Sequence, residues 1–435
     1  MQIFKNILLQ ILTGGLFTGF VTWFILDYFP KPYLLSIVLL GVLYFVLLQL
    51  NIIIHESSHL ITAKRQGLSP KLFVISPFVF YKKEGRTAMQ INTTTMYLFG
   101  GLLIPAMDLP QSAEEFSAAK AKLGKVYHSS VILNIILIIL GLVTVAFILN
   151  FNITPDWSFF FLFAAVNLLF NNIKEYITSS ADTPYLVGDK AAYNKILEDD
   201  IYAAAKIYEY NRMAKDTRDF IHSSDFLPDK LINHLWQVKD QPEAYTPTNI
   251  DIIDNFIYDF ISDSIDELPF VVELYIKKIS GNIRSFLSMP MANASYLMLV
   301  HHIIVCLCKT GHRIDALGIY NEVTSMLDHQ SSPVTVYYQN RSAHVLGLQD
   351  ERDFLNNPEN LKYNNFSDIL SLFGNSLATE KQINNFDYTS VKQAPQAPEE
   401  TENNEPSQEN GTSQIPDTIS VTKDSDTDED NQGSI

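Results

Sequence analysis

Long apolar stretches constrain this chain of 435 residues more than any other feature of its sequence. Four stretches stand out, at residues 7–26, 33–54, 131–149 and 157–177. A helix needs about 20 apolar residues to cross the hydrocarbon core of a bilayer. The chain is therefore predicted to be a polytopic, mainly α protein with about four membrane spans, the first of which is an uncleaved anchor.

The distribution of basic residues predicts how these spans are oriented. The connections at 27–32 and 150–156 hold a single lysine between them, whereas the connection between the second and third spans is rich in basic residues: Lys64, Arg65, Lys71, Lys82, Lys83, Arg86, Lys120, Lys122 and Lys125. Because basic residues favour the cytoplasmic side of a membrane, both termini are expected in the cytoplasm. The compact core of four spans favours a multi-pass protein of a bacterial cell membrane.

The long connection between the second and third spans contains β-prone sequence. Runs at 72–80 and 88–98 flank Lys82-Lys83-Glu84-Gly85, a pattern that predicts a β-hairpin. The apolar segment 99–105 follows, and it is too short to span a bilayer. We expect it to be a re-entrant or interfacial segment that packs against protein rather than lipid.

Composition divides the rest of the chain into a helical part and an acidic tail. The segments 295–308 and 313–326 predict a helical hairpin that resembles a tetratricopeptide repeat around Gly311. Residues 393–435 carry eleven acidic residues and one lysine, a net charge of -10. Such sequence buries too little apolar surface to fold. The predicted units are a membrane-embedded domain (1–197), a cytoplasmic helical domain (198–384) and a disordered acidic tail (385–435).

The sequence His55-Glu56-Ser57-Ser58-His59, at the end of the second apolar stretch, indicates metal chemistry. Positions i and i+4 lie on one face of a helix, so both imidazoles can bind one ion. Zinc accepts two imidazoles and a carboxylate and keeps one position for water. Glu56 would act on that water as general base. Ionisable side chains at a membrane boundary are costly unless they have a function, which favours a catalytic zinc site over a chance pattern.

Over about residues 33–200 the sequence resembles the site-2-protease family of intramembrane metalloproteases (peptidase family M50). That family carries HExxH on one transmembrane helix and an aspartate ligand two helices later, with a glycine-containing re-entrant β-segment between the motif helix and the next span. The corresponding features here are His55 to His59, the aspartates after the fourth span, and Gly100-Gly101. The resemblance implies a zinc metalloendopeptidase that cleaves membrane proteins or peptides near the cytoplasmic face.

Two further motifs of the family are altered in this chain. Its GPxxN element corresponds to Ser130-Val131-Ile132-Leu133-Asn134, without the Gly-Pro. Its NxxP…DG element corresponds to Asn167-Leu168-Leu169-Phe170 and a later aspartate that no glycine follows. The resemblance implies that Asn134 and Asn167 bind substrate beside the metal. Hydrogen bonds between helices, each contributing about 0.6–2 kcal/mol, are the structural alternative.

The third metal ligand stays open between two aspartates. Asp189 follows Gly188, and Asp182 lies nearer to the end of the fourth span; we favour Asp189. Either residue could instead cap a helix or a turn, the common role of aspartate beside glycine or proline. In a membrane zincin with a glutamate as third ligand, Glu175 would take this place.

The altered motifs also leave a second class of function open, a catalytically inactive M50-like membrane scaffold or transporter accessory protein. Intact His55, Glu56 and His59 argue against it. The expected partners are the lipid bilayer, a membrane protein or peptide substrate, and a protein that binds the cytoplasmic helical domain. Nucleic acid is not expected, because subtracting the tail's -10 from the total of -17 leaves about -7 and no basic stripe.

Overall fold

The computed structural model describes most of the chain up to residue 392. The described residues are 33–83, 86–91, 101–150, 155–183, 186–214, 224–290, 292, 294–326, 333–348, 380 and 382–392. The first predicted span, residues 7–26, lies outside them. Within the described residues the chain is mainly helical, as predicted, with a four-stranded sheet and a two-stranded sheet.

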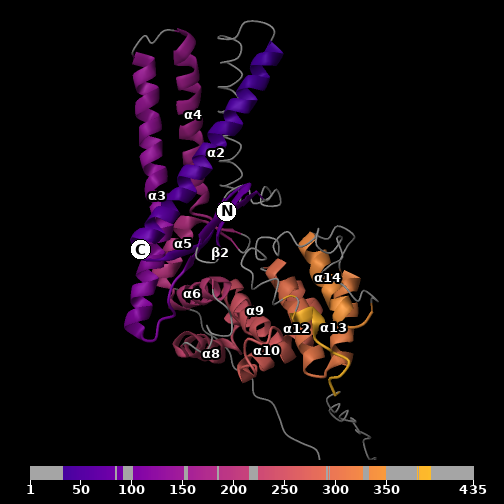
Figure 1. Ribbon diagram of the computed structural model, residues 1–435. Coiled ribbons are helices and arrows are strands. Elements are labelled where there is room, and N and C mark those ends of the chain that lie inside the picture. The colour runs from indigo at the N-terminus through magenta and orange to yellow at the C-terminus, as the bar shows by residue number, and fades with distance from the viewer. Residues whose placement is uncertain are drawn as a thin grey trace, which may run out of the picture. The chain divides into compact units, whose positions relative to one another are not determined.

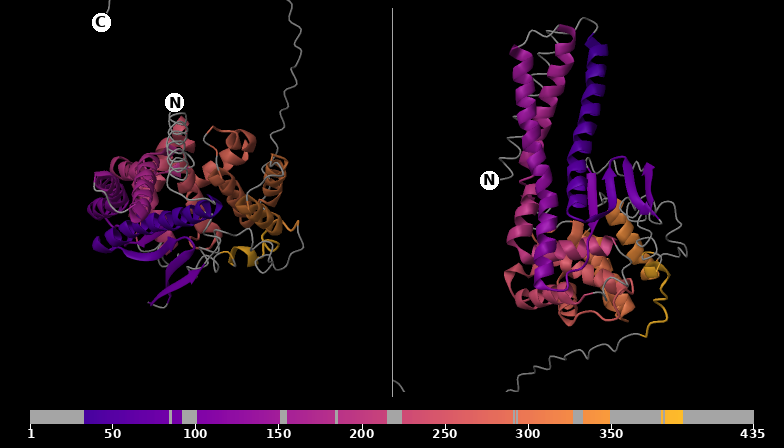
Figure 2. Two further views of the ribbon diagram at one scale, coloured as in Figure 1. Left: turned by 90° about the horizontal axis from the view of Figure 1, so that it is seen from above. Right: turned by 60° about the vertical axis from the view of Figure 1, so that its left-hand side comes forward.

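Three long helices form the first part of the described chain: α2 (Tyr33–Arg65), α3 (Ala113–Asn150) and α4 (Pro155–Thr178). They lie side by side (Figures 1 and 2). The 33 residues of α2 extend about 50 Å at 1.5 Å per residue. Apolar side chains cover the outward faces of α2 and α3. Many of these side chains are about half exposed, among them Val42, Phe45, Ile136 and Ile139.

Both α2 and α3 are long and apolar enough to cross a membrane. In the most apolar window of each helix, 11% of the α2 residues and 22% of the α3 residues are buried. A helix in the core of a soluble protein would be mostly buried, so these two helices have the exposure expected of spans. That α4 crosses the membrane, and that there are four spans in all, stays a prediction.

The sheet follows α2 and packs against its C-terminal part. Its strands are antiparallel in the order β3-β2-β1-β4. The bounds are β1 (Ser69–Ile75), β2 (Phe78–Lys83), β3 (Arg86–Ile91) and β4 (Gly101–Ala106). The predicted hairpin forms between β2 and β3, with Lys83 opposite Arg86. The run 72–80, predicted as one strand, is two strands, because the chain turns at Ser76-Pro77 and proline has no N–H for the ladder.

Strand β4 contains most of the segment 99–105 that was predicted to be re-entrant. It pairs with β1, with Leu102 opposite Val74. Alternate side chains of a strand point to opposite faces, and on one face Leu72, Val74, Val79 and Ile104 form a small buried core. Strand β4 is therefore an edge strand of the sheet, held against protein as expected.

After α4 the chain turns back on itself. A short hairpin of β5 (Asp182–Thr183) and β6 (Leu186–Val187) leads through Gly188 into α5 (Asp189–Glu198). A Cβ at Gly188 would lie 2.4 Å from the carbonyl oxygen of Thr178, so only glycine fits here. The N–H of Ala191 donates to the carbonyl of Ser179 at 3.0 Å. These contacts hold the first turn of α5 against the end of α4.

Helices make up the rest of the described chain. They are α6 (Asp200–Ala214), α8 (Phe226–Val238), η2 (Pro242–Tyr245), α9 (Pro247–Ile261), α10 (Phe270–Ser280), α11 (Ile283–Leu287), α12 (Ala294–Lys309), α13 (Arg313–Met326) and α14 (Pro333–Val345). The predicted helical hairpin is confirmed as α12 and α13, joined through Gly311 at a φ of 85°. That it belongs to a tetratricopeptide-type repeat stays a prediction.

A buried ion pair attaches the C-terminal described segment to this helical part. The Arg341 guanidinium contacts the Glu380 carboxylate at 3.0 Å, and the Tyr337 hydroxyl donates to the same carboxylate at 2.6 Å. Tyr388 lies in the segment predicted to be disordered (385–435), yet it is 7% exposed and donates to the carbonyl of Ile383. Residues 393–435 lie outside the described part of the chain.

Candidate metal centre

Two histidines of α2 and one aspartate from far along the sequence meet at the C-terminal part of α2. The Nε2 atoms of His55 and His59 lie 3.1 Å and 3.3 Å from Oδ2 of Asp189. Each of the three residues offers one candidate ligand atom, and these three atoms lie within 4.8 Å of one another. The described residues thus bring together the two predicted histidines and one of the two predicted aspartates.

The helix geometry of α2 explains why the two histidines are neighbours. They are one turn apart on the same face, and their ring centroids are 5.1 Å apart. Asp189 is the first residue of α5, so the glycine contact at Gly188 fixes where its carboxylate lies. Asp182 instead forms an ion pair with Lys195 at 2.6 Å. Of the two aspartates, Asp189 is the one beside the histidines.

Hydrogen bonds orient two of the three side chains, His59 and Asp189, for a metal ion, whereas the buried Nδ1 of His55 has no partner among the described residues. Nδ1 of His59 lies 2.8 Å from the carbonyl oxygen of Val126 and donates to it, which leaves the Nε2 lone pair directed at the shared site. The Ser130 hydroxyl donates to Oδ2 of Asp189 at 2.6 Å. Sequence reasoning gave Ser130 no role, although it lies one turn before Asn134 on the same face of α3.

Ser130 is expected to strengthen metal binding by holding the Asp189 carboxylate. Replacing Ser130 by alanine should lower metal affinity about 10–100-fold, the usual cost of losing a partner of a metal ligand. Competition with a chromogenic chelator measures this affinity. Thr144→Val is the matched control, because the Thr144 hydroxyl, also on α3, donates to the carbonyl of Leu140 and, within the described residues, contacts no metal ligand. An equal affinity in both variants would contradict a role for Ser130.

The site is partly buried. Glu56 is 8% exposed and His59 is 7% exposed, whereas the Asp189 side chain keeps 22% of its surface accessible. Burial disfavours the charged form of Asp189, but its interactions with the adjacent imidazoles of His55 and His59 outweigh this and hold the pKa of its carboxyl well below the usual range. The carboxylate is therefore ionised and ready to bind a cation.

The donor set selects among metals. Two imidazole nitrogens and one carboxylate oxygen suit zinc and neighbouring transition metals. Calcium and magnesium prefer sites made of oxygen atoms alone. Three protein ligands also leave a coordination position for water or substrate, which is the arrangement of catalytic rather than structural zinc sites. The residues present thus fit a catalytic transition metal.

The remaining predicted site residues lie within the bundle of long helices. Asn134 is 1% exposed, and neither atom of its amide has a hydrogen-bond partner within the described part of the chain. Asn167 is also 1% exposed, and its Oδ1 accepts a bond from Asn171 at 2.8 Å while its Nδ2 has no partner there. Glu175 is not part of the ligand cluster formed by the described residues. Its place as third ligand is taken by Asp189 in this geometry.

Comparison with known proteins gives no match. No family model, no curated protein and no solved structure matches this chain. Function therefore has to be inferred from the geometry of the chain itself.

Proposed function

We propose that this chain is an intramembrane zinc metallopeptidase of the site-2-protease type. It would hydrolyse peptide bonds of membrane proteins or membrane-associated peptides near the cytoplasmic face of a bacterial cell membrane. One observation carries the proposal. His55, His59 and Asp189 converge at the C-terminal end of an apolar helix that is long enough to cross a bilayer. Such side chains are costly in that position unless they serve a function.

The roles of the residues follow from their chemistry. His55, His59 and Asp189 would hold zinc, which when bound supplies a Lewis acid for the scissile carbonyl and a water of lowered pKa. Glu56 takes a proton from the attacking water on its carboxylate. The water oxygen bonds to the carbonyl carbon as the C–N bond breaks, and Glu56 passes the proton to the departing amine nitrogen. The reaction consumes one peptide bond and one water molecule and forms a carboxylic acid and an amine.

The edge of β4 is suited to hold an extended substrate. A peptide in a helix has its carbonyls tied up in intrahelical bonds, so it must unwind before it is cut. We propose that an unwound segment then pairs by strand addition with β4, which is an edge strand of the sheet formed by the described residues. The first residue of this strand, Gly101, lies directly against Glu56: a Cβ there would be 2.2 Å from Cγ of Glu56. A strand added to β4 would consequently pass close to the general base.

Gly101 is expected to be essential for cleavage and dispensable for metal binding. A Cβ in Gly101→Ala would meet Glu56 at 2.2 Å and the carbonyl oxygen of Val74 at 2.6 Å, so Glu56 or β4 must move. Displacement of a reacting group by about 1 Å can cost about 100-fold in rate. Cleavage should fall by about that factor at unchanged zinc content. Gly41→Ala is the control, because a Cβ at Gly41 meets nothing within 4 Å. Normal cleavage by Gly101→Ala would show that the close contact between β4 and Glu56 does not position the general base.

Asn134 and Asn167 are proposed to bind the backbone of the substrate. A buried amide without a partner costs about 1–3 kcal/mol, so it is retained at a disadvantage unless something bonds to it. Among the described residues, both amide atoms of Asn134 lack a hydrogen-bond partner, and so does Nδ2 of Asn167. Asn134 also lies one turn from Ser130, which contacts Asp189. The carbonyls and N–H groups of an unwound peptide beside the metal would satisfy both amides.

The proposed topology follows from the basic residues of the 60–128 connection. Spans at 7–26, 33–54, 131–149 and 157–177 put both termini in the cytoplasm, with the metal site near the inner face. The helical domain would then lie in the cytoplasm, where it can bind a partner protein or select substrates.

Zinc content separates this proposal from an inactive membrane scaffold. The full chain would be purified in detergent and its metals measured by mass spectrometry after dialysis against a weak chelator. The peptidase predicts about one zinc per chain, because His55, His59 and Asp189 form a complete ligand set. A chain that purifies without zinc and cannot be loaded with it would favour the scaffold.

A further inference from the structure

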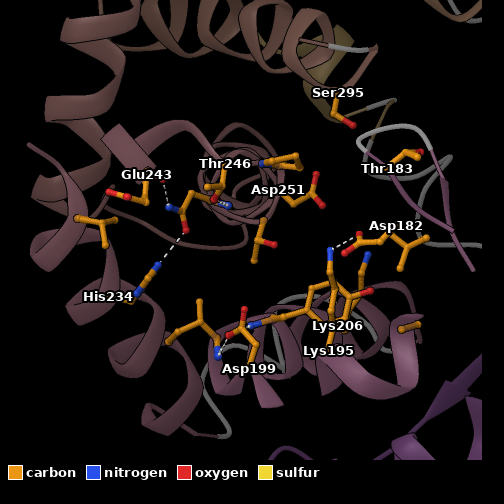
Figure 3. A pocket seen from close by; sticks show the side chains of 18 of the residues that line it. Asp182, Thr183, Lys195, Asp199, Lys206, His234, Glu243, Thr246, Asp251 and Ser295 are labelled. Atoms are coloured by element: carbon orange, nitrogen blue, oxygen red, sulfur yellow. Dashed lines mark hydrogen bonds and ion pairs between the residues drawn. The ribbon is translucent and has the colours of Figure 1, made fainter. Parts of the chain in front are cut away.

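A cavity in the helical part of the chain belongs to no function described so far. Its volume is about 730 Å³, and it lies between α5, α6, α8 and α9 (Figure 3). Small-molecule sites usually measure about 300–1,000 Å³. The connection between α4 and α5 contributes to one wall through Asp182, Thr183 and Val187. The cavity therefore has the size of a ligand site, and its lining decides which ligand fits.

The two lysines of the lining already have anionic partners. Nζ of Lys195 contacts Asp182 at 2.6 Å and lies 5.4 Å from the centre of the Tyr202 ring. Nζ of Lys206 contacts Glu209 at 2.6 Å. Figure 3 shows the Asp182–Lys195 pair at one side of the cavity. Little positive charge is left over for an anionic ligand.

The carboxylates of the lining are only partly compensated. Of the four, Asp182 pairs with Lys195, and Asp199 accepts the backbone N–H groups at the start of α6. Within the described residues, the side chains of Asp251 and Glu243 make no hydrogen bond and no ion pair. Burial raises the pKa of Asp251 to about 7, although the nearby Lys206 opposes the rise. Asp251 is thus a partly buried carboxyl, and Glu243 an exposed one at the rim, and neither has a counter-ion in contact among the described residues.

We propose that this cavity binds a small organic cation with two or more ammonium groups, held by Asp251 and Glu243. An ammonium group donates three hydrogen bonds and can satisfy several carboxylate oxygens at once. Two separate acceptors favour a diamine or polyamine over a single amine. The tyrosine rings of Tyr127 and Tyr202 line the same space and add surfaces against which methylene groups and cations pack.

Titration calorimetry with spermidine tests the proposal on the full chain in detergent. The protein is first stripped of metal with EDTA, so that the result does not depend on the zinc site. Spermidine should bind the wild-type chain, and Asp251→Asn should weaken it at least about tenfold, because a tenfold loss corresponds to about 1.4 kcal/mol, slightly less than a hydrogen bond to a charged group contributes. Asp240→Asn is the matched control: Asp240 is an exposed carboxylate that pairs with Lys239 and Lys278 outside the cavity.

A second variant and a second probe test whether spermidine occupies the cavity and whether its positive charge is required. Thr248→Tyr places a bulky side chain in the cavity and should also weaken spermidine, while thermal unfolding verifies that each variant is folded. Inorganic pyrophosphate, offered in a parallel titration, should not bind. The proposal is overturned if spermidine does not bind, if Asp251→Asn binds it as tightly as Asp240→Asn does, or if pyrophosphate binds in its place.

Discussion

Replacing Asp189 by asparagine is expected to remove zinc from the protein. Asp189 supplies the only carboxylate in contact with both histidines within the described residues, and its Oδ2 lies 3.1 Å and 3.3 Å from their Nε2 atoms. A neutral amide oxygen is a much weaker ligand. Removing a hydrogen-bond partner of a metal ligand lowers metal affinity about 10–100-fold. Removing the ligand itself should lower the zinc affinity more than that. Metal per chain after dialysis against a weak chelator measures it.

Two substitutions serve as controls for this experiment. Asp182→Asn should keep its zinc, because Asp182 pairs with Lys195 and contacts neither histidine. Glu175→Gln should also keep it, which distinguishes this site from a zincin with a glutamate as third ligand. Loss of zinc in either control, with retention in Asp189→Asn, would show that the ligand set is wrong.

Replacing Glu56 by glutamine is expected to slow cleavage strongly and leave zinc bound. Glutamine has nearly the shape of glutamate but cannot accept the proton of the attacking water. General base catalysis contributes about 10²–10⁴-fold, so cleavage should fall by that factor. Comparison of membrane proteomes from cells with wild-type and Glu56→Gln protein would reveal uncut substrates that accumulate in the variant. It would also identify which proteins are cut.

Metal content is the internal control for Glu56→Gln. Because Glu56 is not one of the three clustered ligands, the variant should bind as much zinc as the wild type. Identical proteomes for the two proteins, at equal expression and zinc content, would point to the scaffold function instead. Loss of zinc together with activity would mean that Glu56 acts on the ligands rather than on water.

The part of the site that could be predicted from sequence is the part set by local geometry. His55 and His59 are one helical turn apart, and the helix period alone places both rings on one face. The same local rules predicted the helices α12 and α13 and the hairpin of β2 and β3. Each of these features depends only on residues close together in the sequence.

Features that depend on contacts between distant segments could not be derived in this way. Asp189 and Asp182 were left as alternatives because the turn between α4 and α5 decides which one reaches α2. Gly188 carried the relevant signal: its contact with Thr178 leaves no room for a side chain and directs the first turn of α5. Ser130 has no local signature at all, since its role requires a carboxylate 59 residues away.

The sheet shows the same limit. The apolar segment 99–105 was expected to pack against protein, but its pairing with β1 joins residues about 30 positions apart and could not be derived from its sequence. The tight approach of Gly101 to Glu56 depends on that pairing.

The ten residues of helix α5 contribute to both the candidate metal site and the cavity. Its first residue reaches the histidines, while Ala192 and Lys195 farther along the same helix form part of the cavity wall. A helix of this length is only about 15 Å long, so the metal site and the cavity wall lie within three turns of each other. If a ligand in the cavity changed metal affinity through this helix, metal binding would change the affinity for that ligand by the same factor.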